Sequence, residues 1–184
     1  NLLNLQVWKL GAKNILTVKN LDDKYKEKLK DVSFTPIFIL GLHRSGTTIL
    51  YKMLSKTNKF SILTAYHVIY YDQLLYNHIN KKKKQKKKEL NELLIKEGII
   101  TRITDNVKVS ADYEHEYTYI LSNKLGYDKI NDKNTELMTE ICKKIKFISE
   151  SDKAILLKNP WDFANFLYIK KIFYTAFLLQ KNIY

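Results

Sequence analysis

The fold is decided by one stretch of the chain, Thr35-Pro36-Ile37-Phe38-Ile39-Leu40-Gly41-Leu42-His43-Arg44-Ser45-Gly46-Thr47-Thr48-Ile49-Leu50. Its apolar run from Ile37 to Leu40 is typical of a strand buried on both faces of a parallel sheet. The run enters a loop bounded by Gly41 and Gly46, and the loop opens a helix that we expect over about residues 46–56. A strand, a glycine-bounded loop and a helix in this order point backbone N–H groups and the positive end of a helix dipole at a phosphate.

The loop has the Gly-x4-Gly spacing of a P-loop, but Thr47 stands where an NTP-hydrolysing loop has a lysine. That lysine normally reaches the β- and γ-phosphates, so its absence argues against ordinary ATP or GTP chemistry. The basic group lies inside the loop instead, as Arg44, and Thr47 and Thr48 add hydroxyl donors for phosphate oxygens.

Residues 36–48 closely resemble the 5′-phosphosulfate-binding loop of sulfotransferases that use 3′-phosphoadenosine-5′-phosphosulfate (PAPS), with His43 where that family usually has proline. The resemblance implies PAPS as the co-substrate and no metal. It also implies that the loop residues bind the cofactor, namely Gly41, His43, Arg44, Ser45, Gly46, Thr47 and Thr48.

A second segment carries candidate acids. Ser110 is expected to cap a helix whose apolar face contains Tyr113 and Tyr117, with Glu114 and Glu116 at its edges and His115 facing away. Residues 102–107, followed by residues 114–117, look like the segment of bacterial sulfotransferases that ends in an acidic cluster. This resemblance implies that Glu116, or next Glu114, takes the acceptor's proton; the alternative is an ordinary acid at the boundary of a buried face.

A third segment follows a second buried strand, Ala154-Ile155-Leu156-Leu157-Lys158. Asn159 can cap the next helix and Pro160 suits its first turn, so we expect a helix that continues to about Phe173. Lys158 with Asn159-Pro160 resembles the Leu-Lys-x-Pro element of sulfotransferases, which implies a catalytic lysine beside the phosphate loop. The alternative is a chance lysine at a strand end.

The net charge of +13 raises the question of an anionic partner, and seven of these charges lie in the run Lys81 to Lys88. Subtracting the seven from +13 leaves +6. We expect residues 81–97 to form a basic helical insertion whose lysine half projects from the body, and residues 64–80 to form one helix before it. The run is either a solvated surface or a contact for an anionic acceptor such as a polysaccharide or a lipid headgroup. Nucleic acid is unlikely because no aromatic residues interleave with the lysines.

Further features bound the class of protein. No window holds 18 consecutive apolar residues, so we expect no transmembrane helix, and the start of the chain is not that of a signal peptide. The single Cys142 suggests a reducing compartment, hence a cytoplasmic location. No group of His, Cys and Asp has metal-ligand spacing, and His67 is expected to be structural.

The resemblance covers about residues 35–180 and then stops. Lys181 falls near the family's arginine that grips the 3′-phosphate of PAPS, and the partner serine position lies beyond Tyr184. We therefore expect a chain truncated at its C-terminus, or part of a split gene, that binds the nucleotide weakly or not at all.

Together these features predict an α/β fold with a P-loop-like parallel sheet between two layers of helices, incomplete, in a single domain over residues 1–184. The function that the resemblance implies is transfer of a sulfonate group from PAPS to a hydroxyl or amine of a small-molecule or glycan acceptor. Two alternatives stay open: an inactive remnant or basic binding protein, and a P-loop kinase or NTPase.

Overall fold

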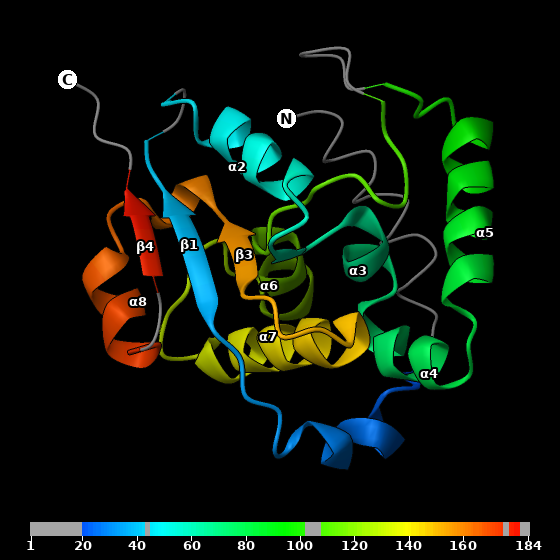
Figure 1. The fold of residues 1–184 in the computed structure, drawn as a ribbon, viewed down its shortest axis with the longest axis horizontal. Coiled ribbons are helices and arrows are strands. Elements are labelled where there is room, and N and C mark those ends of the chain that lie inside the picture. Colours follow the sequence, from blue (N-terminus) through cyan, green and yellow to red (C-terminus); the bar gives the residue numbers. More distant parts are fainter. Residues whose placement is uncertain (1–19, 43–44, 102–107, 175–176, 181–184) are drawn as a thin grey trace. The chain divides into compact units, whose positions relative to one another are not determined.

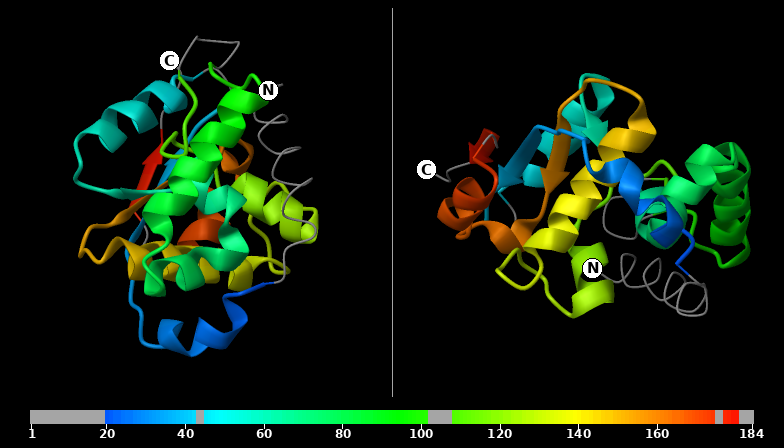
Figure 2. Two further views of the ribbon diagram at one scale, coloured as in Figure 1. Left: turned by 90° about the vertical axis from the view of Figure 1, so that its right-hand side faces the viewer. Right: turned by 90° about the horizontal axis from the view of Figure 1, so that it is seen from below.

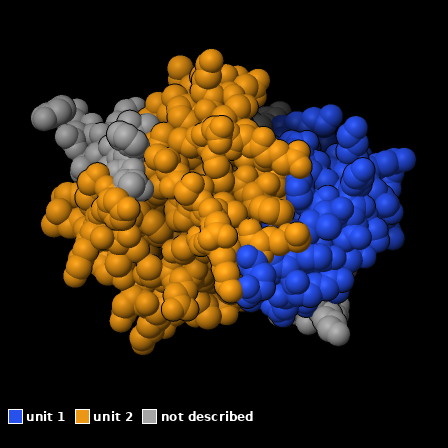
Figure 3. Space-filling view, turned by 60° about the horizontal axis from the view of Figure 1, so that its bottom comes forward, with its two compact units in different colours: residues 1–27, 64–114 blue, residues 28–63, 115–184 orange. Residues whose placement is uncertain are grey.

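The computed structural model describes residues 20–42, 45–101, 108–174 and 177–180. The chain divides into two compact units, which Figure 3 colours separately. Unit 1 comprises residues 1–27 and 64–114, and unit 2 comprises residues 28–63 and 115–184.

The sheet lies in unit 2 and has four strands: β1 (Pro36–Leu40), β2 (Ser61–Ile62), β3 (Ile155–Lys158) and β4 (Phe177–Gln180). Their order is β2-β3-β1-β4, and every pairing is parallel. The expected strand after Thr35 therefore lies at the centre of the sheet, between β3 and β4. The carboxyl ends of β1, β3 and β4 meet at the upper edge in Figure 1.

Helices cover both faces of this sheet. On one face, Ile39 and Leu156 pack against Tyr51 of α2 (Thr47–Lys56). On the other face, the ring of Phe38 lies perpendicular to that of Tyr117, with 6.0 Å between centroids. Figure 2 shows α2 on one side of the strands, and α6 (Thr118–Leu125) and α7 (Thr135–Ser149) on the other. The predicted three-layer α/β fold is confirmed.

Helix α2 has the predicted bounds, but its predicted apolar face is partly wrong. Sequence periodicity places Ile49, Leu50, Met53 and Leu54 on one stripe. In the structure Tyr51 is buried, Leu50 and Leu54 pack beside it, and Ile49 and Met53 are 66% and 64% exposed. The sheet therefore contacts Leu50 and Leu54 beside Tyr51, and it leaves Ile49 and Met53 exposed.

Unit 1 contains short helices: α3 (Ala65–Ile69), the 3-10 turn η2 (Tyr71–Gln73), α4 (Leu74–Ile79) and the longer α5 (Lys83–Lys96). The 3-10 helix η1 (Asp23–Leu29) crosses from this unit into unit 2. The single helix expected over residues 64–80 is wrong. Tyr70 leaves the helical conformation, with φ −104° and ψ 28°, and so separates α3 from η2 and α4. The helix expected within residues 81–97 is present as α5.

Across the part of the chain that the structure describes, no helix is both long enough and apolar enough to cross a bilayer.

Candidate functional site

The loop after β1 is shaped as a turn into α2. Gly41 is buried, and the Ser45 N–H donates to the carbonyl of Leu42 at 3.1 Å. Gly46 has φ +80°, in the left-handed region that favours glycine, and α2 begins at the next residue. His43 and Arg44, two of the predicted cofactor-binding residues, lie outside the described residues.

The beginning of α2 is suited to an anion. Its N-cap is Gly46, which has no side chain to satisfy the first N–H groups, and its first turn carries no acid. Thr47 is buried at this end and Thr48 is half-buried. The Ser45 hydroxyl is also buried, and it has no hydrogen-bond partner among the described residues. A buried hydroxyl without a partner is costly, so its presence beside an uncapped helix start indicates a place for an acceptor from outside the chain.

Lys158 ends β3 at the same edge of the sheet. It pairs in register with Ile39, so its side chain leaves the sheet on the face that α2 covers. Although Lys158 is 4% exposed, its charge is compensated, because its Nζ lies 2.5 Å from Oε1 of Glu116. The structure thus brings together two residues that were singled out from segments more than forty positions apart.

Glu116 is held by its neighbours in the sequence and by α2. The His115 N–H donates to the Leu63 carbonyl at 2.9 Å, and the hydroxyl of Tyr51 lies 3.4 Å from the His115 carbonyl oxygen. The Glu116 N–H donates to Nδ1 of His115 at 3.1 Å. These contacts fix the backbone from which the Glu116 carboxylate reaches Lys158.

His115 itself is a site residue that sequence reasoning missed. It was expected to face away from the apolar stripe, but it is buried with its ring 4.5 Å from that of Tyr119, in a perpendicular arrangement. Burial lowers the pKa of His115 to about 4, so the ring is neutral at pH 7. A neutral ring can accept the Glu116 N–H, and no local pattern in the sequence announces this contact.

The expected helix from Ser110 is wrong, because α6 begins only at Thr118. Residues 110–113 instead form a turn, closed by the Tyr113 N–H that donates to the Ser110 carbonyl at 3.0 Å, and the segment makes further backbone hydrogen bonds. Within unit 1, the N–H groups of Ala65 and Tyr66 donate to the carbonyls of Tyr113 and Ala111, at 2.9 Å each. Glu114, the second candidate base, belongs to this unit, where its backbone pairs with Thr64.

A buried carboxylate secures the turn after Lys158. Asp162 ends the 3-10 helix η3 (Pro160–Asp162), for which Asn159 is the cap that the sequence predicted. Asp162 accepts hydrogen bonds from the Tyr117 hydroxyl at 2.6 Å, the Ile130 N–H at 3.1 Å and the amides of Asn159 and Asn165 at 2.9 Å each. The helix expected to run on to Phe173 is interrupted after η3 and resumes as α8 (Phe166–Ile172).

The ionisation of this network follows from its burial. Burial raises the pKa of Asp162 despite its four donors. Burial and the neighbouring carboxyl raise the pKa of Tyr117 well above its ordinary value, so Tyr117 remains a donor at physiological pH. This cluster positions the strand end that carries Lys158.

Further sequence predictions concern Lys181, residues 102–107, a metal site and His67. Lys181 lies outside the described residues, as do residues 102–107 of the second segment. Among the described residues, no group of three or more His, Cys, Asp and Glu side chains is placed to hold a metal ion. His67 has a structural partner, since its Nδ1 accepts the Thr64 N–H at 3.0 Å.

Comparisons with known proteins identify the family of this chain. A family model described as "Sulfotransferase family" matches residues 36–180. Among solved structures, sulfotransferase STF1 from Mycobacterium tuberculosis H37Rv is 16% identical with a TM-score of 0.54, over 87% of this chain and 48% of its own. Sulfotransferase STF9 from Mycobacterium avium is 12% identical with a TM-score of 0.58, over 86% of this chain and 45% of its own. The chain thus spans about half the length of these two proteins. No curated protein sequence matches it.

Proposed function

Because this chain belongs to the sulfotransferase family, we propose that it transfers a sulfonate group from PAPS to a hydroxyl or amine acceptor. The observation that carries the proposal is the Lys158–Glu116 ion pair at the carboxyl edge of the sheet, the edge at which β1 runs into the loop. In open α/β sheets this edge is where ligands bind. The pair supplies a cation to neutralise the donor's leaving phosphate and a carboxylate to take the acceptor's proton, and both groups assist sulfonate transfer.

The donor's 5′-phosphosulfate would be held by the loop. The N–H groups at the start of α2, the hydroxyls of Ser45, Thr47 and Thr48, and the guanidinium of Arg44 are donors suited to its oxygens. The buried Ser45 hydroxyl would gain the acceptor that it lacks among the described residues. Gly41, Gly46 and His43 complete the loop, and Lys181 is assigned to the 3′-phosphate by resemblance alone.

Glu116 and Lys158 have complementary roles in the proposed reaction. Glu116 takes the proton of the acceptor as the new bond to sulfur forms. The bond from sulfur to the phosphate oxygen breaks at the same time, and Lys158 neutralises the charge that develops on the leaving phosphate. The positioning of the groups supplies much of the expected acceleration, as in phosphoryl transfer. No metal is needed in this scheme.

The ion pair also suggests how the site changes when the donor binds. Without the donor, Lys158 and Glu116 compensate each other's charge in a largely buried setting. A bound phosphosulfate offers Lys158 a second anion, which weakens its hold on Glu116 and frees that carboxylate to turn towards the acceptor. The pair therefore couples donor binding to release of the proposed base.

The cellular location and the class of acceptor also belong to the proposal. Cys142 is buried and is the only cysteine in the sequence, which suits a reducing compartment, so we place the reaction in the cytoplasm. The acceptor is a small molecule or glycan that carries a hydroxyl or amine.

Titration with 3′-phosphoadenosine 5′-phosphate, the product left after transfer, tests the proposal by calorimetry. We expect saturable binding to the chain that Arg44→Ala abolishes. Binding that Arg44→Ala leaves unchanged would refute the assignment of the loop. An absence of heat at millimolar ligand would favour a non-catalytic remnant, and preference for ATP with Mg²⁺ would favour a P-loop kinase.

A further inference from the structure

The lysine run divides into two faces in the structure. Four lysines of the run, Lys82, Lys83, Lys86 and Lys87, are half-buried in unit 1. Three of these four have their Nζ over a tyrosine ring: Lys82 over Tyr76 at 5.0 Å, Lys86 over Tyr70 at 5.9 Å and Lys87 over Tyr66 at 5.8 Å. The exposed lysines of the run are Lys81, which lies in the turn before α5, and Lys84 and Lys88, which lie one turn apart on α5. We define these three as the outer lysine stripe.

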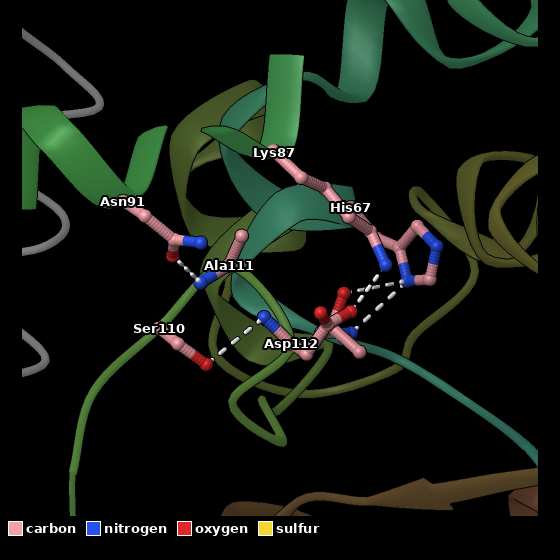
Figure 4. Close-up of polar contacts among 7 residues, drawn as sticks. His67, Lys87, Asn91, Ser110, Ala111 and Asp112 are labelled. Atoms are coloured by element: carbon pink, nitrogen blue, oxygen red, sulfur yellow. Dashed lines mark hydrogen bonds and ion pairs between the residues drawn. The ribbon is translucent and has the colours of Figure 1, made fainter. Parts of the chain in front are cut away.

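Helix α5 holds two lysines of this stripe, Lys84 and Lys88, in a fixed orientation. Leu90 and Leu94 are buried within unit 1. Lys87 forms an ion pair with Asp112, and the Asn91 side-chain oxygen accepts the Ala111 N–H at 2.7 Å. Figure 4 shows both contacts linking α5 to the segment that contains Ser110. The lysine half of α5 is therefore fastened by its inner side chains, and it does not project freely as the sequence suggested.

The placement of these charges is unfavourable for the helix alone. The positive end of the α5 dipole carries lysines and no acid, because the N-cap is Lys82 and the first turn has no acid. Lys84 and Lys88 are like charges one turn apart. Among the described residues, the acid that pairs with the stripe is Glu92, at 3.8 Å from Lys88, and both side chains are largely exposed. An anion bound along the stripe would relieve this repulsion.

The backbone at the start of the stripe is strained as well. Lys81 has φ +56°, in the left-handed region, although it is not glycine and carries a Cβ. Its conformation is held by the Lys81 N–H to the His78 carbonyl at 3.0 Å and by the Lys82 N–H to the Asn77 carbonyl at 2.7 Å. Strain of this kind is concentrated at functional sites, and here it sets the position of the first lysine of the stripe.

We infer that the outer lysine stripe binds an anionic polysaccharide. A nucleic acid would use exposed rings for base stacking, but Tyr66 is 1% exposed and the three rings lie beneath lysine ammonium groups. Residues 81–88 contain only lysine and glutamine, so the stripe has no apolar side chain to insert into a bilayer. A flexible chain of sugar carboxylates or sulfates can follow exposed cations that are close together in the chain, as these three lysines are.

Binding of the fluorescently labelled protein to dextran sulfate, measured by fluorescence anisotropy at several salt concentrations, tests this inference. The variant Lys81→Gln/Lys84→Gln/Lys88→Gln should lose at least about tenfold in affinity and reduce the salt slope by about two to three, one per lost contact. The matched control Lys129→Gln/Lys133→Gln/Lys153→Gln removes three exposed charges from unit 2 and should change affinity far less.

Three outcomes would overturn the inference: no binding of the unaltered chain, an equal loss in both triple variants, or single-stranded DNA competing as well as dextran sulfate at equal charge. Circular dichroism of the first variant checks that α5 remains folded, and stronger helicity is expected because the repulsion is reduced. The inference is independent of the proposed reaction, since titration with 3′-phosphoadenosine 5′-phosphate should give the same affinity in both triple variants.

Discussion

At the scale of single residues, the chemistry depends on how Glu116, Lys158 and His115 share charge and hydrogen bonds. Lys158 is buried and would be costly there without an anion, and Glu116 supplies one at 2.5 Å. Neutral His115 accepts the Glu116 N–H and so orients the backbone that carries the carboxylate. Both contacts lead to a measurable consequence.

Glu116→Gln should slow sulfonate transfer strongly and should strengthen binding of the nucleotide. The amide cannot take the acceptor's proton, so we expect turnover to fall by about 100-fold or more. Lys158 loses its anionic partner in this variant, and its charge becomes fully available to the phosphate of the ligand. Calorimetry with 3′-phosphoadenosine 5′-phosphate should therefore show a several-fold lower Kd.

Glu114→Gln is the matched control for this variant, since it changes the other candidate acid in the same segment. It should leave turnover and Kd close to those of the unaltered chain. Loss of turnover in Glu114→Gln with activity retained in Glu116→Gln would reverse the assignment of the base.

His115 should make the stability of the fold depend on pH. Its pKa is about 4 in the folded chain and 6.5 when unfolded, so between these values the unfolded chain binds the proton more readily. Stability contributed by the neutral ring is present above pH 6.5 and is lost as the pH falls towards 4. From pH 7 to pH 5 the loss should be about 2 kcal/mol. Urea denaturation at the two pH values measures it.

The comparison with His115→Gln isolates this contribution, because every other titrating group is common to both proteins. The difference in free energy of unfolding between the unaltered chain and the variant should narrow as the pH falls from 7 to 5. Parallel curves would contradict the burial of a neutral ring at this position.

At the scale of elements, the site depends on how the ends of strands and helices are secured. The turn from β3 into η3 is fastened by Asp162, a fully buried carboxylate with four donors around it. The turn from β1 into α2 depends on the left-handed conformation of Gly46. The first turn holds Lys158 at the sheet edge, and the second directs the N–H groups of α2.

Asp162→Ala should destabilise unit 2 strongly. The Tyr117 hydroxyl, the Ile130 N–H and two asparagine amides would lose a buried acceptor, at a cost of about 3 kcal/mol or more. The free energy of unfolding in urea measures this loss. Asp152→Ala removes an exposed carboxylate 3.6 Å from Lys146 and should leave stability almost unchanged. Similar effects of the two substitutions would contradict the role given to Asp162.

The sequence was informative where structure is local. The apolar strand, the bounds of α2 and the Asn159 cap follow from patterns within a few residues of one another, and these were predicted correctly. The helix from Ser110 was wrong because its segment bonds instead to the backbone at Leu63, Ala65 and Tyr66, far away in the sequence. The contacts between the lysine run and the rings of Tyr66 and Tyr70 were also missed. They join residues that are separated in the sequence by other helices, so no local pattern predicts them.

At the scale of the whole molecule, the chain joins a parallel α/β sheet to a basic helical unit. The sheet unit carries the loop and the ion pair, the other unit carries the lysine stripe, and the family match over residues 36–180 includes parts of both. The chain spans about half the length of the two solved sulfotransferases that it resembles in fold. The proposal that it binds a nucleotide therefore has to be tested on this chain itself.

Removal of divalent metal should not affect ligand binding by the whole chain. The proposed site uses only cations and N–H groups of the protein, so EDTA should leave the Kd for 3′-phosphoadenosine 5′-phosphate unchanged. A P-loop kinase or NTPase would bind ATP with Mg²⁺, and EDTA would weaken that binding. A loss of nucleotide binding in EDTA would contradict the metal-free site.

The central claim is that the loop after β1 holds the phosphate end of the nucleotide, and an amide NMR titration tests it most directly. 3′-Phosphoadenosine 5′-phosphate should cause saturable shifts in the amide resonances of Ser45 to Thr48, even if binding is only millimolar. Shifts confined to other segments, or no shift of these amides at millimolar ligand, would contradict the account.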